Sequence, residues 1–204
     1  ISYEGSTFVA VGASGTILTS SDGTSWTSRT SGTSQRLKGV SYGGSTFVAV
    51  GSSGTILTSS DGISWTSRTS GTSQALSGIS YGGSTFVAVG SSGTILTSSD
   101  GTSWTSRTSG TTKSLGGVIY GNDNFVAVGD TGTILTSSDG TSWTSRTSGT
   151  SQYLSGISYG GSTFVAVDAS GTILTSSDGT SWTSRTTGTS QALSGISYGG
   201  STQY

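Results

Sequence analysis

The sequence predicts an all-β protein, a five-bladed β-propeller whose four-stranded antiparallel blades come from 39-residue repeats. Strand-forming residues recur at fixed places between short Gly- and Ser-rich turns, and the chain contains no Pro. A four-stranded unit of about 40 residues is the size of one propeller blade. The repeat is marked most plainly by the five tryptophans, each 39 residues after the last: Trp26, Trp65, Trp104, Trp143 and Trp182.

The repeats place the whole chain, 1–204, in a single propeller domain. No charge run or shift in composition divides it. We expect residues 196–204 to be a partial sixth copy that closes the ring, because Ile196–Ser201 repeats Ile1–Ser6. The five full repeats are 1–39, 40–78, 79–117, 118–156 and 157–195.

Each repeat contains four candidate strands joined by short connections. Leu76–Tyr81 represents the first strand, Thr46–Val50 the second, Thr55–Ser59 the third and Ser64–Thr69 the fourth. The connections GGS, GSSG, SDG and SGTSQ are rich in turn formers. Connections this short favour antiparallel neighbours, because a parallel crossover needs a dozen or more residues.

The second strand, TFVAV, is apolar on both sides, which indicates that each sheet is covered on two faces. Phe47 and Ala49 would face one neighbouring blade, and Val48 and Val50 the other. A parallel β-solenoid is the alternative fold. Its coils are usually shorter, and its repeats lack a regular hairpin signal such as Asp-Gly.

The two ends of the chain suggest how the ring closes. The segment Leu193–Tyr198 is a complete copy of the first strand, whereas the copy at Ile1 lacks the preceding Leu-x-Gly. We predict a "velcro" closure in which this segment supplies the inner strand to the blade of Phe8, Ile17 and Trp26, removing exposed sheet edges. The expected state is a monomer, and exchange of this strand between chains is the alternative.

The string SSDGTSW, at Ser20–Trp26 and in the later repeats with the single change to Ile63 in the second, resembles the Asp-box or bacterial neuraminidase repeat. The wider pattern ILTSSDGTSWT with a TFVAVG strand is similar to propeller repeats of the photosystem II assembly factor type. In that family Asp and Trp are five residues apart, whereas Asp22 and Trp26 are four apart. The tighter spacing predicts a two-residue Asp-Gly hairpin with positive φ at both positions.

The Asp-box residues are predicted to stabilise the fold. The Asp22 carboxylate can accept backbone N–H groups within its own turn, and Trp26 would shield the hairpin. All five copies are equivalent, which favours a structural role over a catalytic one. The set comprises Asp22, Trp26, Asp61, Trp65, Asp100, Trp104, Asp139, Trp143, Asp178 and Trp182.

Composition removes several classes of function. The chain has no Cys and no His, so it lacks the usual ligands of transition metals and the commonest general base. We expect no metal and no cofactor. The net charge of −1 and the scattered basic residues do not favour nucleic-acid binding, and no apolar run is long enough to span a membrane.

Enzymatic activity is not expected. The resemblance implies that a related sialidase site would gather an arginine cluster, a Tyr–Glu pair and an acidic residue at the ring centre. The sole Glu, Glu4, lies in a turn. No unique carboxylate pair is present, which a glycosidase needs. The repeated arginines fall on the fourth, outermost strand: Arg29, Arg68, Arg107, Arg146 and Arg185.

The positions that break the repeat are the candidate binding residues. They lie at the junction into the first strand and in the loop between the second and third strands, which a propeller places on one face. The repeated glutamines could hydrogen-bond sugar hydroxyls by avidity. Neutral drift on exposed loops is the alternative reading. The candidates are Gln35, Arg36, Lys38, Gln74, Lys113, Asp130, Gln152, Tyr153, Asp168 and Gln191.

Three hypotheses for function follow. The first is a non-catalytic binding or scaffold propeller for a glycan or protein ligand, of extracellular or cell-surface bacterial origin. The second is a symmetric propeller without an evolved ligand, made by recent amplification or by engineering. The chain begins at Ile1 rather than Met, which favours a processed, excised or engineered segment. The third, remote hypothesis is a sialidase-like hydrolase.

Overall fold

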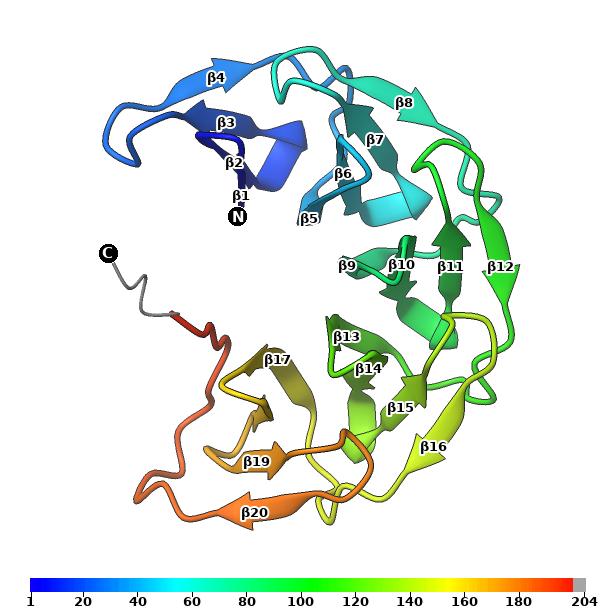
Figure 1. Cartoon of the computed structure of the whole chain (residues 1–204), viewed down its shortest axis with the longest axis vertical. Helices are drawn as coiled ribbons and strands as arrows, with labels where there is room; N and C mark the ends of the chain where they lie inside the picture. The colour runs from blue at the N-terminus through cyan, green and yellow to red at the C-terminus, as the bar shows by residue number, and fades with distance from the viewer. Residues whose placement is uncertain (200–204) are drawn as a thin grey trace.

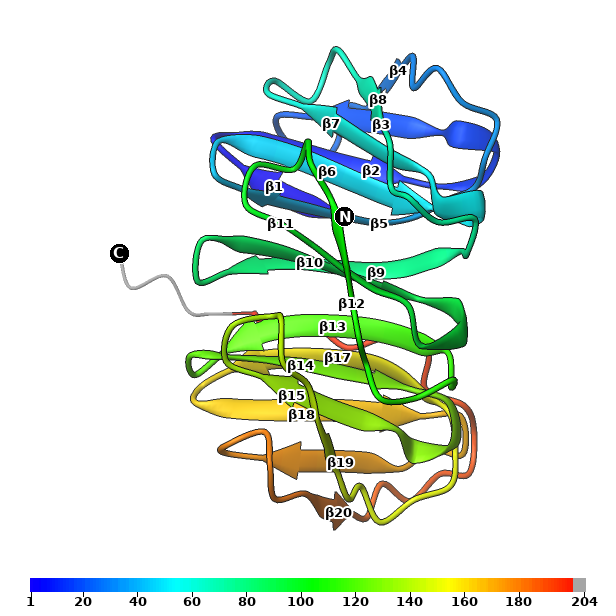
Figure 2. The same cartoon turned by 90° about the vertical axis from the view of Figure 1, so that its right-hand side faces the viewer.

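The computed structural model describes residues 1–199 as five four-stranded antiparallel sheets arranged around a central axis (Figure 1). Within each sheet the strands lie in chain order, from an inner strand near the axis to an outer strand at the rim. Viewed from the side, the sheets stack face to face (Figure 2). The predicted all-β, five-bladed propeller is confirmed.

Apart from β1, which has three residues where the other inner strands have seven, the strands recur with nearly the same lengths in every sheet. The first sheet contains β1 (Ser2–Glu4), β2 (Thr7–Val11), β3 (Ile17–Ser20) and β4 (Thr27–Arg29). The second contains β5 (Leu37–Gly43), β6 (Thr46–Gly51), β7 (Ile56–Ser59) and β8 (Thr66–Arg68). The third contains β9 (Leu76–Gly82), β10 (Thr85–Gly90), β11 (Ile95–Ser98) and β12 (Thr105–Arg107).

The last two sheets follow the same plan. The fourth contains β13 (Leu115–Gly121), β14 (Asn124–Gly129), β15 (Ile134–Ser137) and β16 (Thr144–Arg146). The fifth contains β17 (Leu154–Gly160), β18 (Thr163–Asp168), β19 (Ile173–Ser176) and β20 (Thr183–Arg185). One-turn 3₁₀ helices join the second and third strands of the first four sheets: η1 (Ala13–Gly15), η2 (Ser52–Gly54), η3 (Ser91–Gly93) and η4 (Asp130–Gly132).

The hairpin between the first and second strands uses two residues with positive φ. Gly44 and Ser45 have φ of 52° and 64°, and Asn122 and Asp123 have 46° and 56°. Two central residues of this kind form a type I′ turn, whose twist matches that of the flanking strands. The sequence change to Asn-Asp in the fourth repeat therefore keeps the same turn, because both residues tolerate positive φ.

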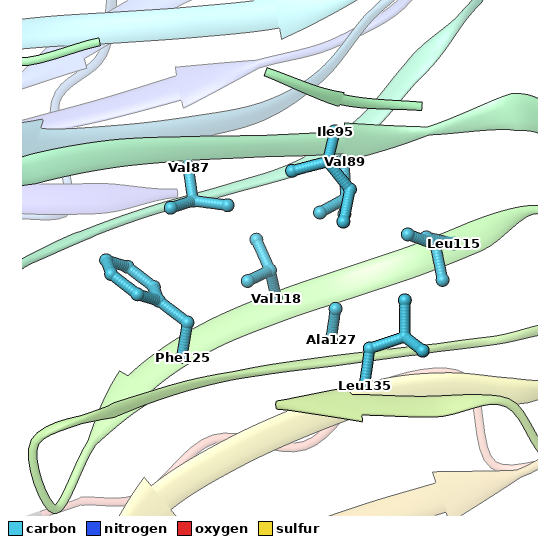
Figure 3. Packing of buried hydrophobic residues seen from close by; sticks show 8 residues of the cluster. All are labelled: Val87, Val89, Ile95, Leu115, Val118, Phe125, Ala127 and Leu135. Atoms are coloured by element: carbon cyan, nitrogen blue, oxygen red, sulfur yellow. The ribbon is translucent and has the colours of Figure 1, made fainter. Parts of the chain in front are cut away.

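The core consists of layers between successive sheets rather than one central cluster. Phe47 and Ala49 pack against Val9 of the first sheet, while Val48 and Val50 pack against the third sheet. The predicted division of the TFVAV strand between two neighbours is confirmed. Figure 3 shows the same arrangement one sheet further on, where Val87, Val89 and Ile95 of the third sheet meet Leu115, Val118, Phe125, Ala127 and Leu135 of the fourth.

A second contact near the axis repeats between neighbouring sheets. The ring of Tyr120 lies on Gly82 of the preceding sheet so closely that a Cβ at that glycine would be 2.0 Å from the ring. Tyr81 lies on Gly43 in the same way, at 2.0 Å, and Tyr159 on Gly121, at 2.3 Å. The next sheet thus requires the first glycine after the tyrosine at each of these three positions.

The predicted closure by Leu193–Tyr198 is not what the structure shows. Within the described residues this segment forms no strand, and the edge of β2 is occupied by β1 in the register Ser2↔Val9. The segment instead lies against the fifth sheet, where Tyr198 covers Gly160. Residues 200–204 of the partial sixth copy lie outside the described residues, and a closed ring stays a prediction.

Candidate binding face

Eight of the ten predicted binding residues lie at one end of the sheets, in loops that we call the junction face, and Lys38 and Asp168 lie in the adjoining strands β5 and β18. The junction face comprises the junctions into the inner strands (residues 33–36, 72–75, 111–114, 150–153 and 189–192) and the turns 13–15, 52–54, 91–93, 130–132 and 169–171. Backbone hydrogen bonds join the two kinds of loop: the Ser52 N–H donates to the Arg36 carbonyl at 2.8 Å, and the Asp130 N–H to the Ser114 carbonyl at 2.9 Å. The two kinds of loop therefore lie side by side.

Two of the predicted glutamines hold the adjacent turn. The Oε1 atom of Gln35 accepts a hydrogen bond from the Ser53 hydroxyl at 3.2 Å, and that of Gln74 accepts one from Ser92 at 3.4 Å. Their side-chain NH₂ groups remain at the exposed surface. Gln152 and Gln191 are exposed at the corresponding junctions, as is Lys113.

Arg36 and Lys38 place two positive charges together on the second sheet. Both side chains are exposed. Lys38 falls at a β-bulge, where the register of β5 shifts between Leu37 and Gly39. A bulged residue leaves the ladder, and its side chain is re-aimed. The same bulge recurs at Gly116 in β13 and at Ser155 in β17, so this sequence position is variable because the ladder does not use it.

Tyr153 and Gly116 fit one another across two sheets. A Cβ at Gly116 would lie 2.3 Å from the Tyr153 hydroxyl oxygen, so the tyrosine occupies space that only glycine leaves free. Tyr153 nevertheless remains 39% exposed. Burial of the rest of the ring, with a smaller contribution from the Asp130 charge, raises the pKa of Tyr153. Its hydroxyl therefore stays protonated and can donate a hydrogen bond.

Asp168 does not belong to this exposed set, which corrects the prediction. It is fully buried, and its carboxylate accepts the N–H groups of Ser170 at 2.9 Å and Thr172 at 2.8 Å. Burial alone would raise the pKa of Asp168, but these hydrogen bonds together outweigh it, and the pKa lies below its usual value. Asp168 replaces the glycine of the other sheets, and its side chain organises the turn that η1 to η4 form elsewhere.

The Asp-box loops form a compact hydrogen-bonded turn at the opposite end. Asp22 accepts the N–H groups of Thr24 and Ser25, both at 2.8 Å, and the Ser20 hydroxyl at 3.0 Å. The Trp26 indole N–H donates to the Gly23 carbonyl at 3.1 Å. These bonds, led by the Ser25 N–H, lower the pKa of Asp22 well below its usual range.

The predicted two-residue Asp-Gly hairpin is wrong. Gly23 has a φ of 72°, but Asp22 is not among the residues with positive φ, and six residues separate β3 from β4. The carboxylate reaches forward to two N–H groups, so the chain makes a wider Asx-type loop instead. The bonds recur in the other four repeats, so all five loops have the same geometry, and a structural role for the Asp and Trp sets stays a prediction.

The five repeated arginines lie on the outermost strands, as predicted. Each Nε atom donates to a threonine hydroxyl on the adjacent third strand, as Arg107 does to Thr97 at 2.8 Å. The arginines are therefore spread around the rim and do not converge on the axis. Among the described residues, no group of three or more acidic, His or Cys side chains is arranged to hold a metal ion.

Sequence reasoning missed Gly116 as the partner of Tyr153. Both residues break the repeat, and they occur in consecutive repeats on the two sides of one sheet interface. That coincidence was visible in the sequence, but the distance between them required the packing of the sheets. Within residues 1–199, no helix is long and apolar enough to cross a membrane.

No family model matches the sequence, and a comparison with curated proteins gives no significant match. Solved propeller structures are similar in fold. A structure described as YCF48 bound to D1 peptide is 21% identical, with a TM-score of 0.64 over 80% of this chain and 57% of that one. YCF48 from Cyanidioschyzon merolae is 18% identical, with a TM-score of 0.65 over 90% of this chain and 70% of that one.

Two further similar structures differ in origin. A nidogen/laminin complex contains a chain that is 17% identical, with a TM-score of 0.67 over 95% of this chain and 82% of that one. The computationally designed Ika8 protein is 14% identical, with a TM-score of 0.77 over 97% of this chain and 64% of that one. The chain thus spans less than two thirds of the length of two of these proteins, and these identities show the fold alone.

Proposed function

We propose that this chain is a non-catalytic scaffold that binds an extended segment of a protein on its junction face. The observation that carries the proposal is the fit of Tyr153 over Gly116, which leaves an aromatic ring 39% exposed. A rigid aromatic ring that is already ordered loses little entropy on binding, and tyrosine is enriched at binding hot spots.

Charge on the junction face supports a segment with opposite charges along its length. Arg36 and Lys38 lie on the second sheet, whereas Asp130 and Tyr153 lie at the interface of the fourth and fifth sheets. A bound segment would complement both regions if its acidic end lay over Arg36 and Lys38 and its basic end lay over Asp130. Complementary charges of this kind set orientation and specificity more than affinity.

The comparisons support the class of ligand. One similar propeller is described with a bound peptide, and another is in a complex between two proteins. Both descriptions concern those proteins and not this chain. Because the fold is shared, a protein segment is the first class of ligand to test here. Within this proposal the SSDGTSW loops serve as Asp-boxes in kind, holding the opposite end of each sheet and leaving the junction face free for recognition.

The test is selection from a displayed library of random peptides, followed by affinity measurement on purified variants. Tyr153→Ala and the double change Arg36→Ala with Lys38→Ser recreate residues that the second repeat (40–78) carries at these positions, Ala75 and Ser77, so the fold is preserved. We expect each to weaken binding at least about tenfold, which corresponds to about 1.4 kcal/mol. Gly116→Ser should act like Tyr153→Ala because it fills the space of the tyrosine.

A matched control and two contrary outcomes make the test decisive. Tyr3→Ala removes an exposed tyrosine from the inner strand of the first sheet and should leave peptide affinity unchanged. Equal affinity of all variants would contradict the proposal. A glycan array in parallel would assign the face to sugars if it alone gave Tyr153-dependent binding. Silence in both would favour a symmetric propeller without an evolved ligand, the hypothesis that the similarity to a designed protein also fits.

A further inference from the structure

The two ends of the row of sheets leave complementary halves of one sheet interface open. At each internal interface the earlier sheet contributes two valines and an isoleucine, and the later sheet contributes its phenylalanine, alanine, leucine, tyrosine and tryptophan. Within residues 1–199, the fifth sheet presents the first half of this set and no further sheet follows it. The first sheet presents the second half without a preceding sheet (Figure 1).

Side-chain burial shows that both halves are uncovered. Val126 and Ile134 of the fourth sheet are 0% exposed, whereas their counterparts Val165 and Ile173 are only partly buried. On the first sheet, Phe8 and Leu18 are likewise only partly buried, although the equivalent residues of every later sheet are at most 3% exposed. Side chains of the same type are thus buried at the four internal interfaces but partly exposed on the outer faces of the first and fifth sheets.

The C-terminal segment already occupies the place of a sixth inner strand. The Leu193 N–H donates to the Asp168 carbonyl at 3.1 Å, just as the Leu37 N–H of the second sheet donates to the Gly12 carbonyl at 2.9 Å. The ring of Tyr198 lies on Gly160 as that of Tyr159 lies on Gly121. The segment therefore lies where an inner strand would lie, and within residues 1–199 no second, third or fourth strand pairs with it.

The first sheet lacks the inner strand that this segment would supply. β1 has three residues, whereas the other inner strands have seven. In the other repeats a glycine at this position lies under the tyrosine ring of the next sheet, but the first sheet has Glu4 there. The C-terminal segment has the glycine, Gly199. Leu193–Gly199 is thus a longer and sterically better partner for β2 than β1 is.

We infer that the fifth sheet and Leu193–Gly199 of one copy bind the first sheet of a second copy, forming a hybrid blade. In this blade the C-terminal segment of one chain displaces β1 and pairs with β2–β4 of the other. A second copy is the occupant because the new contact continues, with the same kinds of residue, the interface already present four times in the chain. Closure within one chain would require the two ends in Figure 1 to come together.

An apolar hollow marks the docking point on the fifth sheet. It has a volume of about 60 Å³, and Val165, Ile196 and Tyr198 are among the residues that line it. At internal interfaces this position is filled by the Asp-box glycine of the next sheet, as Gly179 does over Val126. Gly23 of the second copy would fill it here. Such a head-to-tail contact builds a ring or an open filament, depending on whether the rotation closes.

The first test is the mass of the protein in solution by light scattering over about a hundredfold range of concentration. We expect the mass to rise from that of the 20.2 kDa chain toward multiples of it. Val165→Lys should raise the dissociation constant at least about tenfold, because it places a charge in the apolar contact. Ser145→Lys, on the exposed face of β16, adds the same charge elsewhere and should assemble normally. A constant monomer mass would overturn the inference.

The second test traps the exchanged strand with Val9→Cys and Ser197→Cys in a chain that has no other cysteine. If the segment replaces β1, Ser197 takes the place of Ser2 opposite Val9, and opposite residues lie about 4.5–5.5 Å apart at Cα, within disulfide range. We expect a reducible ladder of linked chains. A disulfide within the monomer, or none, would overturn the second-copy assignment. Val9→Cys with Ser2→Cys, in the Val165→Lys background, is the control for geometry.

Discussion

The interface between the third and fourth sheets and the open face of the fifth sheet contain the same strand sequence in different surroundings. Val87 and Val89 are fully buried against Phe125, whereas Val165 in an identical TFVAV string is only partly buried. Local sequence therefore determines the strand, but the neighbouring sheet determines how much each side chain contributes. Stability in such an array depends on nearest-neighbour interfaces, and each interface can be tested against the ends.

The largest expected difference in unfolding free energy is between two phenylalanine substitutions, one at an internal interface and one at an open face. Phe125→Ala leaves a cavity in a fully buried interface and should reduce the free energy of unfolding by about 3–5 kcal/mol. Phe8→Ala, on the open face of the first sheet, should cost less than about 2 kcal/mol, because the ring is already partly hydrated. Denaturant unfolding at low protein concentration, followed by circular dichroism, measures both. Equal losses would contradict the contrast between interior and end.

A smaller effect is expected from the glycines beneath the tyrosine rings. Gly82→Ala places a methyl group where the Tyr120 ring lies, and overpacking of this kind costs about 1–3 kcal/mol. Gly160→Ala meets only Tyr198 of the C-terminal segment, which can move away, so the expected cost is below about 0.5 kcal/mol. The same unfolding measurement applies. A large loss from Gly160→Ala would mean that the segment is held as firmly as an internal strand.

The repeat made most of the fold predictable. The spacing of the tryptophans and the four strand patterns were sufficient for blade number, strand order and the two-faced burial of Phe47 and Val48. The hairpin at Asp22 was predicted incorrectly, because an Asp-Gly pair forms either a tight hairpin or an Asx loop, and the choice depends on which N–H groups the carboxylate reaches.

The candidate site was less predictable than the fold. The sequence indicated the junction face and the exposed residues Arg36, Lys38 and Tyr153. It could not distinguish the burial of Asp130 from that of Asp168. Asp130 remains near the surface, whereas Asp168 is buried because it replaces the glycine that the other repeats have at the start of this turn. The place of Leu193–Tyr198 was also missed, because pairing with β2 and packing on β17 call for the same strand sequence.

The smallest expected effect concerns the Asp-box carboxylates, which are alike at the ends and in the middle. The hydroxyl of Thr102 and the N–H groups of Ser103 and Thr102 hold the pKa of Asp100 far below its usual value. A carboxylate with a lowered folded-state pKa stabilises the fold above its unfolded value, near 4, and loses that contribution as the pH falls. Stability should therefore be constant from about pH 7 to pH 5 and decline below about pH 4.

Substitution sharpens that prediction. Asp100→Asn and Asp22→Asn should each make the acid decline shallower, and by the same extent, because both carboxylates accept the same pair of backbone N–H groups. Unfolding free energies measured at a series of pH values provide the comparison. A larger change for Asp100 than for Asp22 would show that the neighbouring sheet, and not the loop alone, tunes these carboxylates.

Trp26 gives the chain an optical property that follows from its position. The other four indoles pack against the interface clusters, whereas Trp26 is exposed and borders the open face of the first sheet. An indole in contact with water emits at longer wavelength than one in an apolar environment. We therefore expect the long-wavelength edge of the intrinsic fluorescence to come mainly from Trp26, at the end of the molecule where the second copy is proposed to bind. Binding at that end can then be followed by this emission without an added dye.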